Sequence, residues 1–402
     1  MDIQAIRKQF PGLKDKVFLD SACVSLAPLC AVDAVQGFLK IAAECPARSS
    51  THHHILMDEM RGEARREAAR LISAAEDEIA IVESTTHGLS IAADAIPLSR
   101  GDEVLICDLE YLQVAVPWSQ KQASEGIRLV MVPNSGGIVT LDDMAAHLTE
   151  KTKVLAISSV QWSNGFRSNL AALSSLCRER NIWLVVDAVQ HLGAMPLDVR
   201  ETPVDILACG GHKWLNSPFG AGLLYIRKSR LLELKKLTAG YLSLENPEGG
   251  WETYFQTPSI SPLREYTFVD EARRYEVGGT ANYPGAVGLA ASLKMINGIG
   301  RDNIASHILE LTDSLMEGLR TLGIEVVTPA EKRYRSGIVT FSLGPVERNL
   351  ALMNHLLNHR ILVSVRYTSH VGGVRVSCHF FNSKDDLARL LSRVEDFLKK
   401  KL

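Results

Sequence analysis

Two charged side chains follow apolar runs at positions where strands of a parallel sheet would end. Asp187 closes the run Trp183–Asp187, and Lys213 ends the segment Gly210–Lys213, which follows the apolar run Asp205–Cys209. The carboxyl ends of parallel strands meet at one edge of a sheet, so both side chains can face one crevice. There a carboxylate can keep a pyridine nitrogen protonated, and an amine can form an imine and then exchange protons. Taken singly, each residue has an equally good alternative: Asp187 could cap a helix, and Lys213 could be a solvated surface side chain.

A polar turn before a helical segment is a second candidate site. Glu83–Gly88 has the sequence Glu-Ser-Thr-Thr-His-Gly, between a strand that ends at Glu83 and a helix expected to begin near Gly88. Threonine hydroxyls and free amides at a helix N-terminus bind anions such as phosphate. The alternative for Thr85 or Thr86 is an ordinary N-cap.

Short apolar runs alternate with amphipathic segments through most of the chain. The predicted strands are Ile79–Glu83, Glu103–Cys107, Arg128–Val132, Val154–Ser159, Trp183–Asp187, Ile206–Ala208 and Gly222–Tyr225. Several are β-branched runs without strict alternation, which is typical of strands covered on both faces. The predicted helices between them are Met60–Ala74, Gly88–Ala95, Val116–Ser124, Leu141–His147 and Leu170–Arg180. This repetition predicts an α/β fold with a mostly parallel central sheet flanked by helices.

The C-terminal part predicts a smaller α/β domain. Tyr241–Glu276 contains three prolines and little periodicity, which indicates a long loop. The elements expected after it are helices at Asn282–Ile296 and Ile299–Leu322, strands near Ile324–Val327, Gly337–Ser342 and Val374–Ser377, and a last helix from Lys384. A chain of 402 residues exceeds one compact core. We expect an N-terminal segment 1–14 that packs with the small domain, a large domain 15–283 and a small domain 284–402.

Composition and charge exclude several classes of protein. The 44 Lys and Arg against 46 Asp and Glu leave no basic excess for nucleic acid or an anionic membrane. No apolar run approaches the roughly 20 residues of a membrane span. Seven scattered cysteines without a Cys-x-x-Cys pair indicate reduced thiols and a cytoplasmic location. His52–His54 lacks metal-ligand spacing, so no metal site is predicted.

Taken together, the motifs resemble the class V aminotransferases, which are pyridoxal 5′-phosphate (PLP) enzymes of fold type I. They run in family order from Val17–Ala22 to Arg375, so the resemblance covers nearly the whole chain. It is strongest to the branch of cysteine desulfurases, selenocysteine lyases and isopenicillin N epimerase-like proteins. The resemblance implies PLP as the cofactor, held by Lys213 as a Schiff base with Asp187 at its ring nitrogen, and an amino acid as the substrate.

The resemblance also assigns residues to the rest of the cofactor. Gln190 would hydrogen-bond its phenolic oxygen, and His212 would help to hold its phosphate. Gly210 stands where many relatives carry a serine that also donates to the phosphate. The remaining phosphate ligands would come from the family's Thr-Thr turn, here Thr85, Thr86 and His87.

Further matched positions concern the cofactor ring and the substrate. Tyr111 stands where the family has a histidine that stacks on the ring; a phenol can stack there but cannot shuttle protons at neutral pH. Arg375 matches the arginine whose planar fork binds the substrate α-carboxylate. His53 lies in the stretch where relatives carry a histidine at the active-site mouth, and Trp162 is more like the epimerase-like branch. The alternatives are a packing role for Tyr111 and a surface position for Arg375.

The segment Glu276–Asn282 resembles the family loop that reaches across a dimer interface. Thr280 would donate to the phosphate in the partner subunit, so a homodimer with shared active sites is expected. The alternative is a Gly-Gly turn that caps the next helix.

The predicted reaction is β-elimination, which cleaves the C–S bond of a cysteine derivative without a catalytic cysteine. Desulfurases of the family carry a nucleophilic cysteine shortly before the carboxylate-binding arginine, and Arg366–Gly373 contains none. Cys378 follows Arg375 by three residues, so alternation places it on the opposite face of the strand. Cys23 lies in the N-terminal loop, close to the expected substrate pocket. An amino-acid epimerase or aminotransferase is the alternative, and a binding protein with a vestigial cofactor site is the other class.

Overall fold

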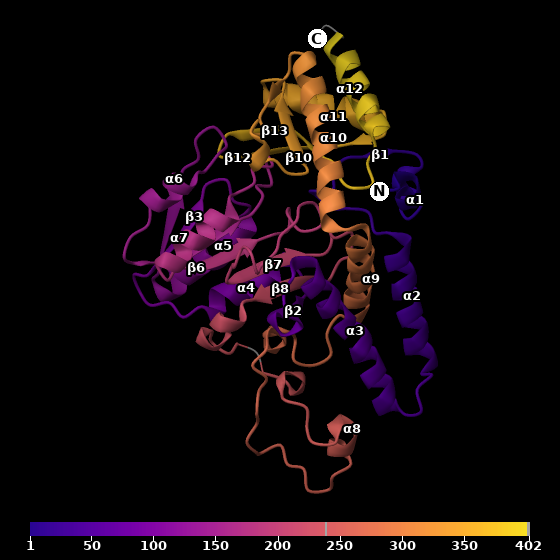
Figure 1. The fold of residues 1–402 in the computed structure, drawn as a ribbon, viewed down its shortest axis with the longest axis vertical. Helices are drawn as coiled ribbons and strands as arrows, with labels where there is room; N and C mark the ends of the chain where they lie inside the picture. Colours follow the sequence, from indigo (N-terminus) through magenta and orange to yellow (C-terminus); the bar gives the residue numbers. More distant parts are fainter. Residues whose placement is uncertain (238, 400–402) are drawn as a thin grey trace.

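A seven-stranded sheet lies at the centre of the computed structural model, which describes residues 1–237 and 239–399 (Figure 1). Its strand order is β2-β8-β7-β6-β5-β3-β4, in which β4, β3, β5, β6 and β7 are parallel and β8 is antiparallel to both neighbours. The strands are β2 (Ile79–Val82), β3 (Glu103–Cys107), β4 (Arg128–Val132), β5 (Thr152–Ser158), β6 (Trp183–Asp187), β7 (Ile206–Gly210) and β8 (Gly222–Ile226). The predicted α/β fold with a mostly parallel sheet is confirmed.

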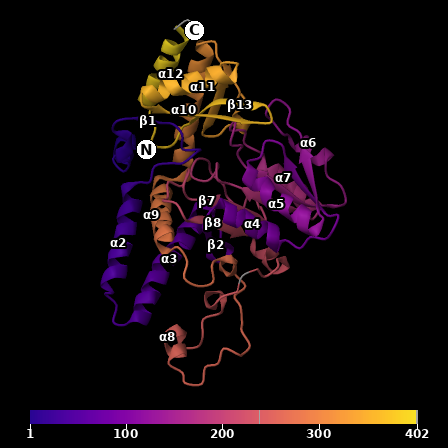
Figure 2. The same ribbon diagram turned by 180° about the vertical axis from the view of Figure 1, so that it is seen from behind.

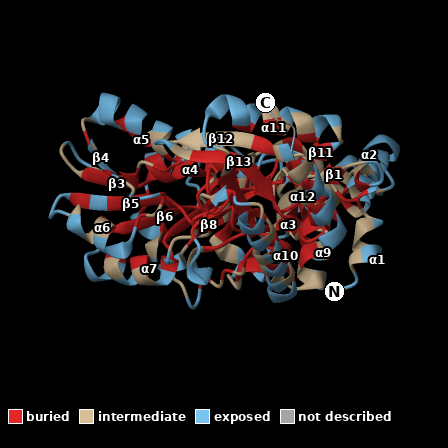
Figure 3. Cartoon of the chain, turned by 90° about the horizontal axis from the view of Figure 1, so that it is seen from above, coloured by how far each residue is buried: buried red, intermediate tan, exposed pale blue. Residues whose placement is uncertain are grey.

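The strands of this sheet contribute side chains to two hydrophobic cores, one on each face, which explains why their sequences are continuous apolar runs. On β6, Leu184 and Val186 belong to one core and Val185 belongs to the other, as the two-residue period of a strand requires. Buried residues concentrate in the sheet, while the outer faces of the helices are exposed (Figure 3). The helices are α3 (Ser50–Ile72), α6 (Leu141–Ala146), α7 (Leu170–Glu179) and α9 (Tyr283–Ile299) on one face, and α4 (Thr85–Ala95) and α5 (Leu112–Glu125) on the other.

A second, antiparallel sheet of order β12-β13-β10-β9 lies in the C-terminal part of the chain. Helices pack on it around a separate core that includes Leu315, Phe341 and Val376 (Figure 1). The elements are α10 (Arg301–Thr321), β9 (Glu325–Val326), β10 (Ile338–Ser342), α11 (Val346–Asn358), β11 (Ile361–Leu362), β12 (Ser364–Thr368), β13 (Val371–Ser377) and α12 (Lys384–Lys399). None of the helices within the described ranges is both long and apolar enough to span a membrane.

The N-terminal segment is attached to this second sheet. β1 (Val17–Phe18) pairs in parallel with β11, and Arg7 in α1 (Ile3–Arg7) forms an ion pair of 2.8 Å with Asp386. The N-terminal helix α1 and the C-terminal helix α12 therefore lie beside the small sheet, in the upper part of Figures 1 and 2. The division into domains stays a prediction, and α9, which follows the predicted boundary, contributes to the core of the large sheet.

Several elements differ from the prediction at their ends. α3 begins at Ser50, ten residues before the predicted start, because the Ser49 hydroxyl caps it by accepting from the His52 amide. α4 begins at Thr85 rather than near Gly88. The helices α2 (Leu29–Glu44) and α11 and the strand β12 were not predicted, whereas the segment 241–276 is largely irregular, as expected, with one short helix, α8 (Gly250–Phe255).

Phe10 is expected to be the main apolar anchor of the N-terminal segment. It is 1% exposed, and its ring centroid lies 4.8 Å from that of Phe381. Phe10→Ala should lower the free energy of unfolding by about 3–5 kcal/mol, because it leaves a cavity at a packed junction. Chemical denaturation measures this change. Phe255→Ala is the matched control at a 59% exposed position, and an equal loss in both variants would contradict the prediction.

Candidate active site

The carboxyl ends of β2, β3, β5, β6 and β7 meet at one edge of the large sheet, and a cavity of about 290 Å³ opens there. Arg366 and Arg375 of the small sheet and the loop after β1, with Ala22 and Cys23, line its other side. The cavity is lined by Ala22, Cys23, Ser84, Thr85, Thr86, Tyr111, Gln113, Trp162, Asp187, Val189, Gln190, His212, Lys213, Arg366 and Arg375. Eight of the predicted site residues are thus brought together, while His53, His87 and Thr280 are not among its lining residues.

Asp187 is a buried carboxylic acid with few partners. Its side chain is 3% exposed, and Oδ1 accepts a hydrogen bond of 2.9 Å from the Val189 amide. No ion pair to it is present among the described residues. Burial raises the pKa of Asp187 from 3.8 to about 6, and the amide and the nearby charge of Lys213 reduce the effect. The carboxylate would therefore gain strongly from a cationic partner in the cavity.

Lys213 presents an amine without an ion-pair partner in the described part of the chain. The turn that carries it is fixed by hydrogen bonds from the Gly211 amide to Ala221 and from the Asn216 amide to Lys213. Burial lowers the pKa of Lys213, Asp187 opposes the shift and Arg375 adds to it. A lowered pKa increases the fraction of neutral amine, which is the nucleophilic and proton-accepting form.

Two aromatic rings stand beside this amine. The Nζ atom of Lys213 lies 5.7 Å from the centroid of the Tyr111 ring, and that ring meets Trp162 edge-on at 5.2 Å. Below them the buried Glu110 carboxylate accepts from the Ser158 amide and from Gln161, which ties the ends of β3 and β5 together. Tyr111 is 44% exposed, so its face is free for a flat ligand.

The predicted anion-binding turn is the N-terminus of α4. Ser84, rather than Thr85 or Thr86, is the N-cap, and its hydroxyl accepts from the His87 amide at 3.1 Å. The amides of Thr85 and Thr86 are therefore among those that a helix leaves unpaired. The Thr85 hydroxyl accepts from the Gly210 amide at 2.8 Å, which places the turn beside the end of β7.

Gly210 lies where neighbouring side chains leave little room for a Cβ atom. A Cβ there would lie 2.9 Å from the Thr85 hydroxyl oxygen and 3.1 Å from Nδ1 of His212. A serine like that of many relatives would need the two neighbours to shift. The turn thus combines backbone amides, one hydroxyl and one imidazole.

The two histidines near this turn differ in orientation. His212 lines the cavity and stacks on Phe219 with ring centroids 5.2 Å apart; burial, with the charge of Lys213, lowers its pKa to about 4. It is therefore a neutral hydrogen-bonding group at pH 7. His87 instead turns back, and its Nδ1 accepts from the Glu83 amide at 3.3 Å. Its amide is already used by Ser84, so neither group is directed at the cavity.

Gln190 and Arg375 are held by contacts of their own. Gln190 donates to the Ala22 carbonyl at 2.9 Å and accepts from the Trp214 indole at 2.7 Å. The second hydrogen of its side-chain amide is therefore available to a ligand. Arg375, on β13, is buried, donates to the Trp162 carbonyl at 2.9 Å and pairs with Asp20 at 3.1 Å. Burial lowers its pKa, and Asp20 opposes that shift.

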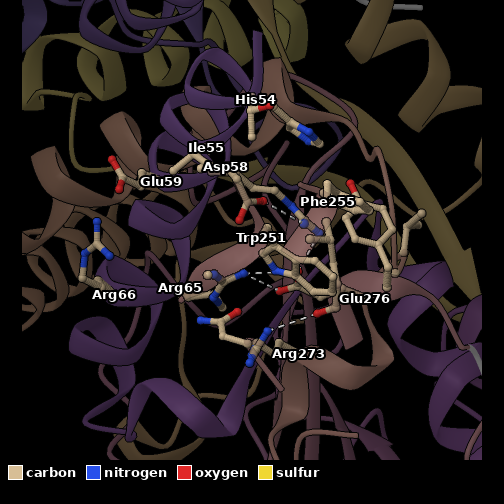
Figure 4. Close-up of a pocket in the computed structure, with 18 residues that line it drawn as sticks. His54, Ile55, Asp58, Glu59, Arg65, Arg66, Trp251, Phe255, Arg273 and Glu276 are labelled. Atoms are coloured by element: carbon tan, nitrogen blue, oxygen red, sulfur yellow. Dashed lines mark hydrogen bonds and ion pairs between the residues drawn. The ribbon is translucent and has the colours of Figure 1, made fainter. Parts of the chain in front are cut away.

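His53 and Thr280 lie elsewhere in the subunit. Thr280 is exposed and precedes α9. His53 is in the first turn of α3, where its Nδ1 is buried without a hydrogen-bond partner among the described residues. Its neighbour His54 instead lines a second cavity of about 620 Å³, between α3 and the 241–278 segment, in which Trp251 and Glu276 also lie (Figure 4).

Arg366 and Gln113 line the cavity although the sequence did not assign them to it. The signal in the sequence was the polar–apolar alternation of Ser364–Thr368, which is typical of a strand. In the structure Arg366 lies on this strand, β12, two positions beyond Ser364, the residue that pairs with Arg375 on β13. Strand alternation therefore puts both arginines on one face of the small sheet. Cys23 lies in the cavity, in agreement with its expected place near the substrate.

A buried acid and a lysine without an ion-pair partner among the described residues, after neighbouring strands and beside a helix N-terminus, define a PLP-type site. The chain belongs to the aminotransferase class-V family, whose model matches residues 17–390. A probable cysteine desulfurase of Pyrococcus abyssi is 26% identical over 411 residues, covering 98% of this chain and 97% of that protein.

Solved structures show the same fold. A cysteine desulfurase from Thermococcus onnurineus has a TM-score of 0.86 at 24% identity and covers 99% of this chain and 98% of its own. A complex of the cystine C–S lyase C-DES with its product cysteine persulfide has a TM-score of 0.86 at 24% identity, covering 97% and 100% of the two chains. The predicted family and the PLP cofactor are confirmed.

The donor groups of this chain fit that cofactor. Asp187 is a buried acid whose one recorded hydrogen bond leaves capacity for a protonated ring nitrogen, and Lys213 is an amine without an ion-pair partner in the described chain. The α4 N-terminus at Thr85 and Thr86 matches the needs of a phosphate. The individual contacts of these residues with PLP stay a prediction.

The burial of Asp187 predicts how stability depends on pH in the protein without PLP. Its folded pKa, about 6, exceeds its ordinary value, 3.8, so the folded state binds more protons between these values and stability falls as pH rises through this window. Asp187→Asn removes the acid and should stabilise the PLP-free protein by about 2–3 kcal/mol above pH 6, with no gain near pH 3. Chemical denaturation at both pH values measures the difference. The exposed Asp33→Asn is the control, and equal stability of wild type and Asp187→Asn at pH 7 would refute the assignment.

Proposed function

We propose that this protein is a PLP-dependent C–S lyase that cleaves a cysteine derivative by β-elimination, without a catalytic cysteine. The observation that carries the proposal is the β12–β13 hairpin. Thr368 pairs with Val371, so only Ser369 and His370 form the turn, both with positive φ. Relatives that form persulfides carry their nucleophilic cysteine on a loop in this stretch, and here a two-residue turn leaves neither the loop nor the thiol.

The remaining cysteines support the same proposal. Cys378 is fully buried in the core of the small sheet, and burial raises its pKa to about 12, so it is an inert thiol. Cys23 is the one cysteine among the residues that line the described cavity, and it is exposed. The C–S lyase C-DES, whose fold this chain shares, is a precedent for C–S cleavage on this scaffold.

The roles of the residues follow from their positions. PLP held by Lys213, Asp187 and the N-terminus of α4 would supply an electron sink for the substrate Cα. Lys213 takes the proton from Cα, because it supplies the amine among the residues that line the cavity. Asp187 keeps its negative charge at the ring nitrogen. Arg375 binds the α-carboxylate and thereby orients the Cα–H bond toward Lys213.

The overall reaction balances as elimination followed by hydrolysis. A cysteine S-conjugate and one water give a thiol, pyruvate and ammonium. The Cα proton leaves to Lys213, the electron pair of the C–S bond leaves with the sulfur, and the released thiolate is protonated. Tyr111, whose ring centroid lies 5.7 Å from Nζ of Lys213, would cover one face of the cofactor ring by stacking.

The proposed reaction predicts equimolar pyruvate, ammonium and thiol from S-alkylcysteines, and equimolar pyruvate, ammonium and cysteine persulfide from cystine. Lys213→Ala should reduce turnover by at least about a thousandfold, because it removes the proton acceptor, while the exposed Lys235→Ala should retain it. Lactate dehydrogenase coupling and a thiol reagent measure the products. Cys23→Ala should also remain active.

Two other results would indicate a different reaction of the same family. Racemised amino acid or keto acid without thiol, from every conjugate tested, would indicate the epimerase or aminotransferase. A persulfide trapped on Cys23 during turnover, together with an inactive Cys23→Ala variant, would indicate a desulfurase with its thiol at a new position.

We also propose that the active form is a homodimer in which Thr280 donates to the phosphate of PLP in the partner subunit. Its exposed position outside the cavity of its own subunit supports an action in trans. Homodimers of Lys213→Ala and of Thr280→Val should both be impaired at limiting PLP. Their heterodimer should regain about half the wild-type activity, because one of its two sites has both residues. Activity no higher than the average of the two homodimers would refute the shared site.

A further inference from the structure

Arg366 occupies a position in the cavity that the proposed reaction does not use. It lies on β12 opposite Gly373, and Arg375 lies opposite Ser364 on the same face, so the two arginines are diagonal neighbours across the strands. Such neighbours are roughly 7–8 Å apart. Both line the cavity that contains Lys213.

Of the two guanidinium groups, that of Arg375 has a carboxylate partner and that of Arg366 has none among the described residues. Arg375 pairs with Asp20, whose Oδ1 also accepts from Ser364 at 2.8 Å. Arg366 donates to the Val365 carbonyl at 2.9 Å, and its second terminal nitrogen lies 3.6 Å from the Cys23 sulfur. Across residues 1–237 and 239–399, no carboxylate lies within ion-pair distance of Arg366.

This leaves a partly buried cation without a counter-charge at the substrate end of the cavity. Its positive charge acts on Arg375, whose pKa it helps to lower. An amino acid brings one α-carboxylate, which the proposed function assigns to Arg375. A second anion on the substrate would neutralise Arg366 by charge-assisted hydrogen bonds, which are the strong ones in a partly desolvated site.

We propose that Arg366 selects substrates whose leaving sulfur carries an anionic group, such as a carboxylate, and this proposal rests on the proposed C–S lyase activity. The diagonal separation of the two arginines suits an acid at each end of a chain of one sulfur and a few carbons. S-carboxymethylcysteine is such a molecule. Its elimination with one water gives mercaptoacetate, pyruvate and ammonium, with Lys213 accepting the Cα proton and the sulfur leaving with the C–S electron pair.

The decisive comparison uses two substrates of nearly equal shape and different charge. S-carboxymethylcysteine and its side-chain amide, S-carbamoylmethylcysteine, are given to the holoenzyme, and kcat/KM is measured for each. Wild type should prefer the acid by at least about tenfold, because the acid alone pairs with the guanidinium. Arg366→Gln should lower kcat/KM for the acid, leave the amide within about twofold and so abolish the preference.

Two further variants separate recognition from folding. Arg366→Lys keeps the charge and should retain part of the preference, whereas Arg389→Gln, at an exposed position of α12, should retain all of it. If Arg366→Gln prefers the acid as strongly as wild type does, or if wild type cleaves acid and amide equally well, the proposal for Arg366 is wrong and the lyase activity stands.

A binding measurement separates this proposal from the reaction. L-2-aminoadipate has the skeleton of S-carboxymethylcysteine with a methylene in place of sulfur, so it cannot undergo C–S cleavage. Calorimetry on the holoenzyme should show tighter binding of L-2-aminoadipate than of its side-chain amide in wild type and equal binding in Arg366→Gln. If that pattern holds while no conjugate is cleaved, Arg366 recognises a second acid and the lyase proposal fails; equal binding in wild type overturns the Arg366 proposal.

Discussion

The burial of one carboxylate at the end of β6 is the constraint on which the site depends. Asp187 is buried at the end of this strand, and burial raises its pKa to about 6 although the Val189 amide and the charge of Lys213 oppose the shift. A cation beside the carboxylate lowers this raised pKa and favours the charged form, and a protonated ring nitrogen is such a cation. Burial has the opposite effect on the neighbouring Lys213, because it lowers the pKa of an amine. Both shifts are possible because rigid, doubly covered strands leave the two side chains little freedom to move toward water.

The parts of the site that the sequence could predict are those attached to the large sheet. Asp187, Lys213 and the Thr85–Thr86 turn each follow an apolar run, and parallel strands bring such positions to one edge. The strand predictions succeeded for the same reason, since β3, β4 and β6 are long apolar runs with the predicted bounds. What strand periodicity cannot supply is the orientation of a side chain after the strand. His87 was expected at the phosphate, yet its ring accepts from the backbone of Glu83 instead.

The parts that escaped prediction depend on contacts between distant segments. Arg366 lies on a strand whose five residues alternate between polar and apolar, but its importance comes from Asp20, more than three hundred positions earlier, being paired with Arg375. The N-cap at Ser49 extended α3 by ten residues through a stretch of histidines with no apolar period. The pairing of charges across a cavity is a property of the folded chain, and sequence spacing does not encode it.

The pairing of β1 with β11 has a consequence for how the protein is made. Val17 pairs with Ile361, and Asp20 forms an ion pair with Arg375, so this segment must wait for strands that are synthesised more than three hundred residues later. The large sheet can assemble during translation because β8 ends at residue 226, with the antiparallel β2 beside it. The substrate side of the cavity cannot close until β13 has been synthesised. Non-local pairings of this kind slow folding, so a nascent chain stalled before β13 would leave the cavity without Arg375 on a finished large sheet.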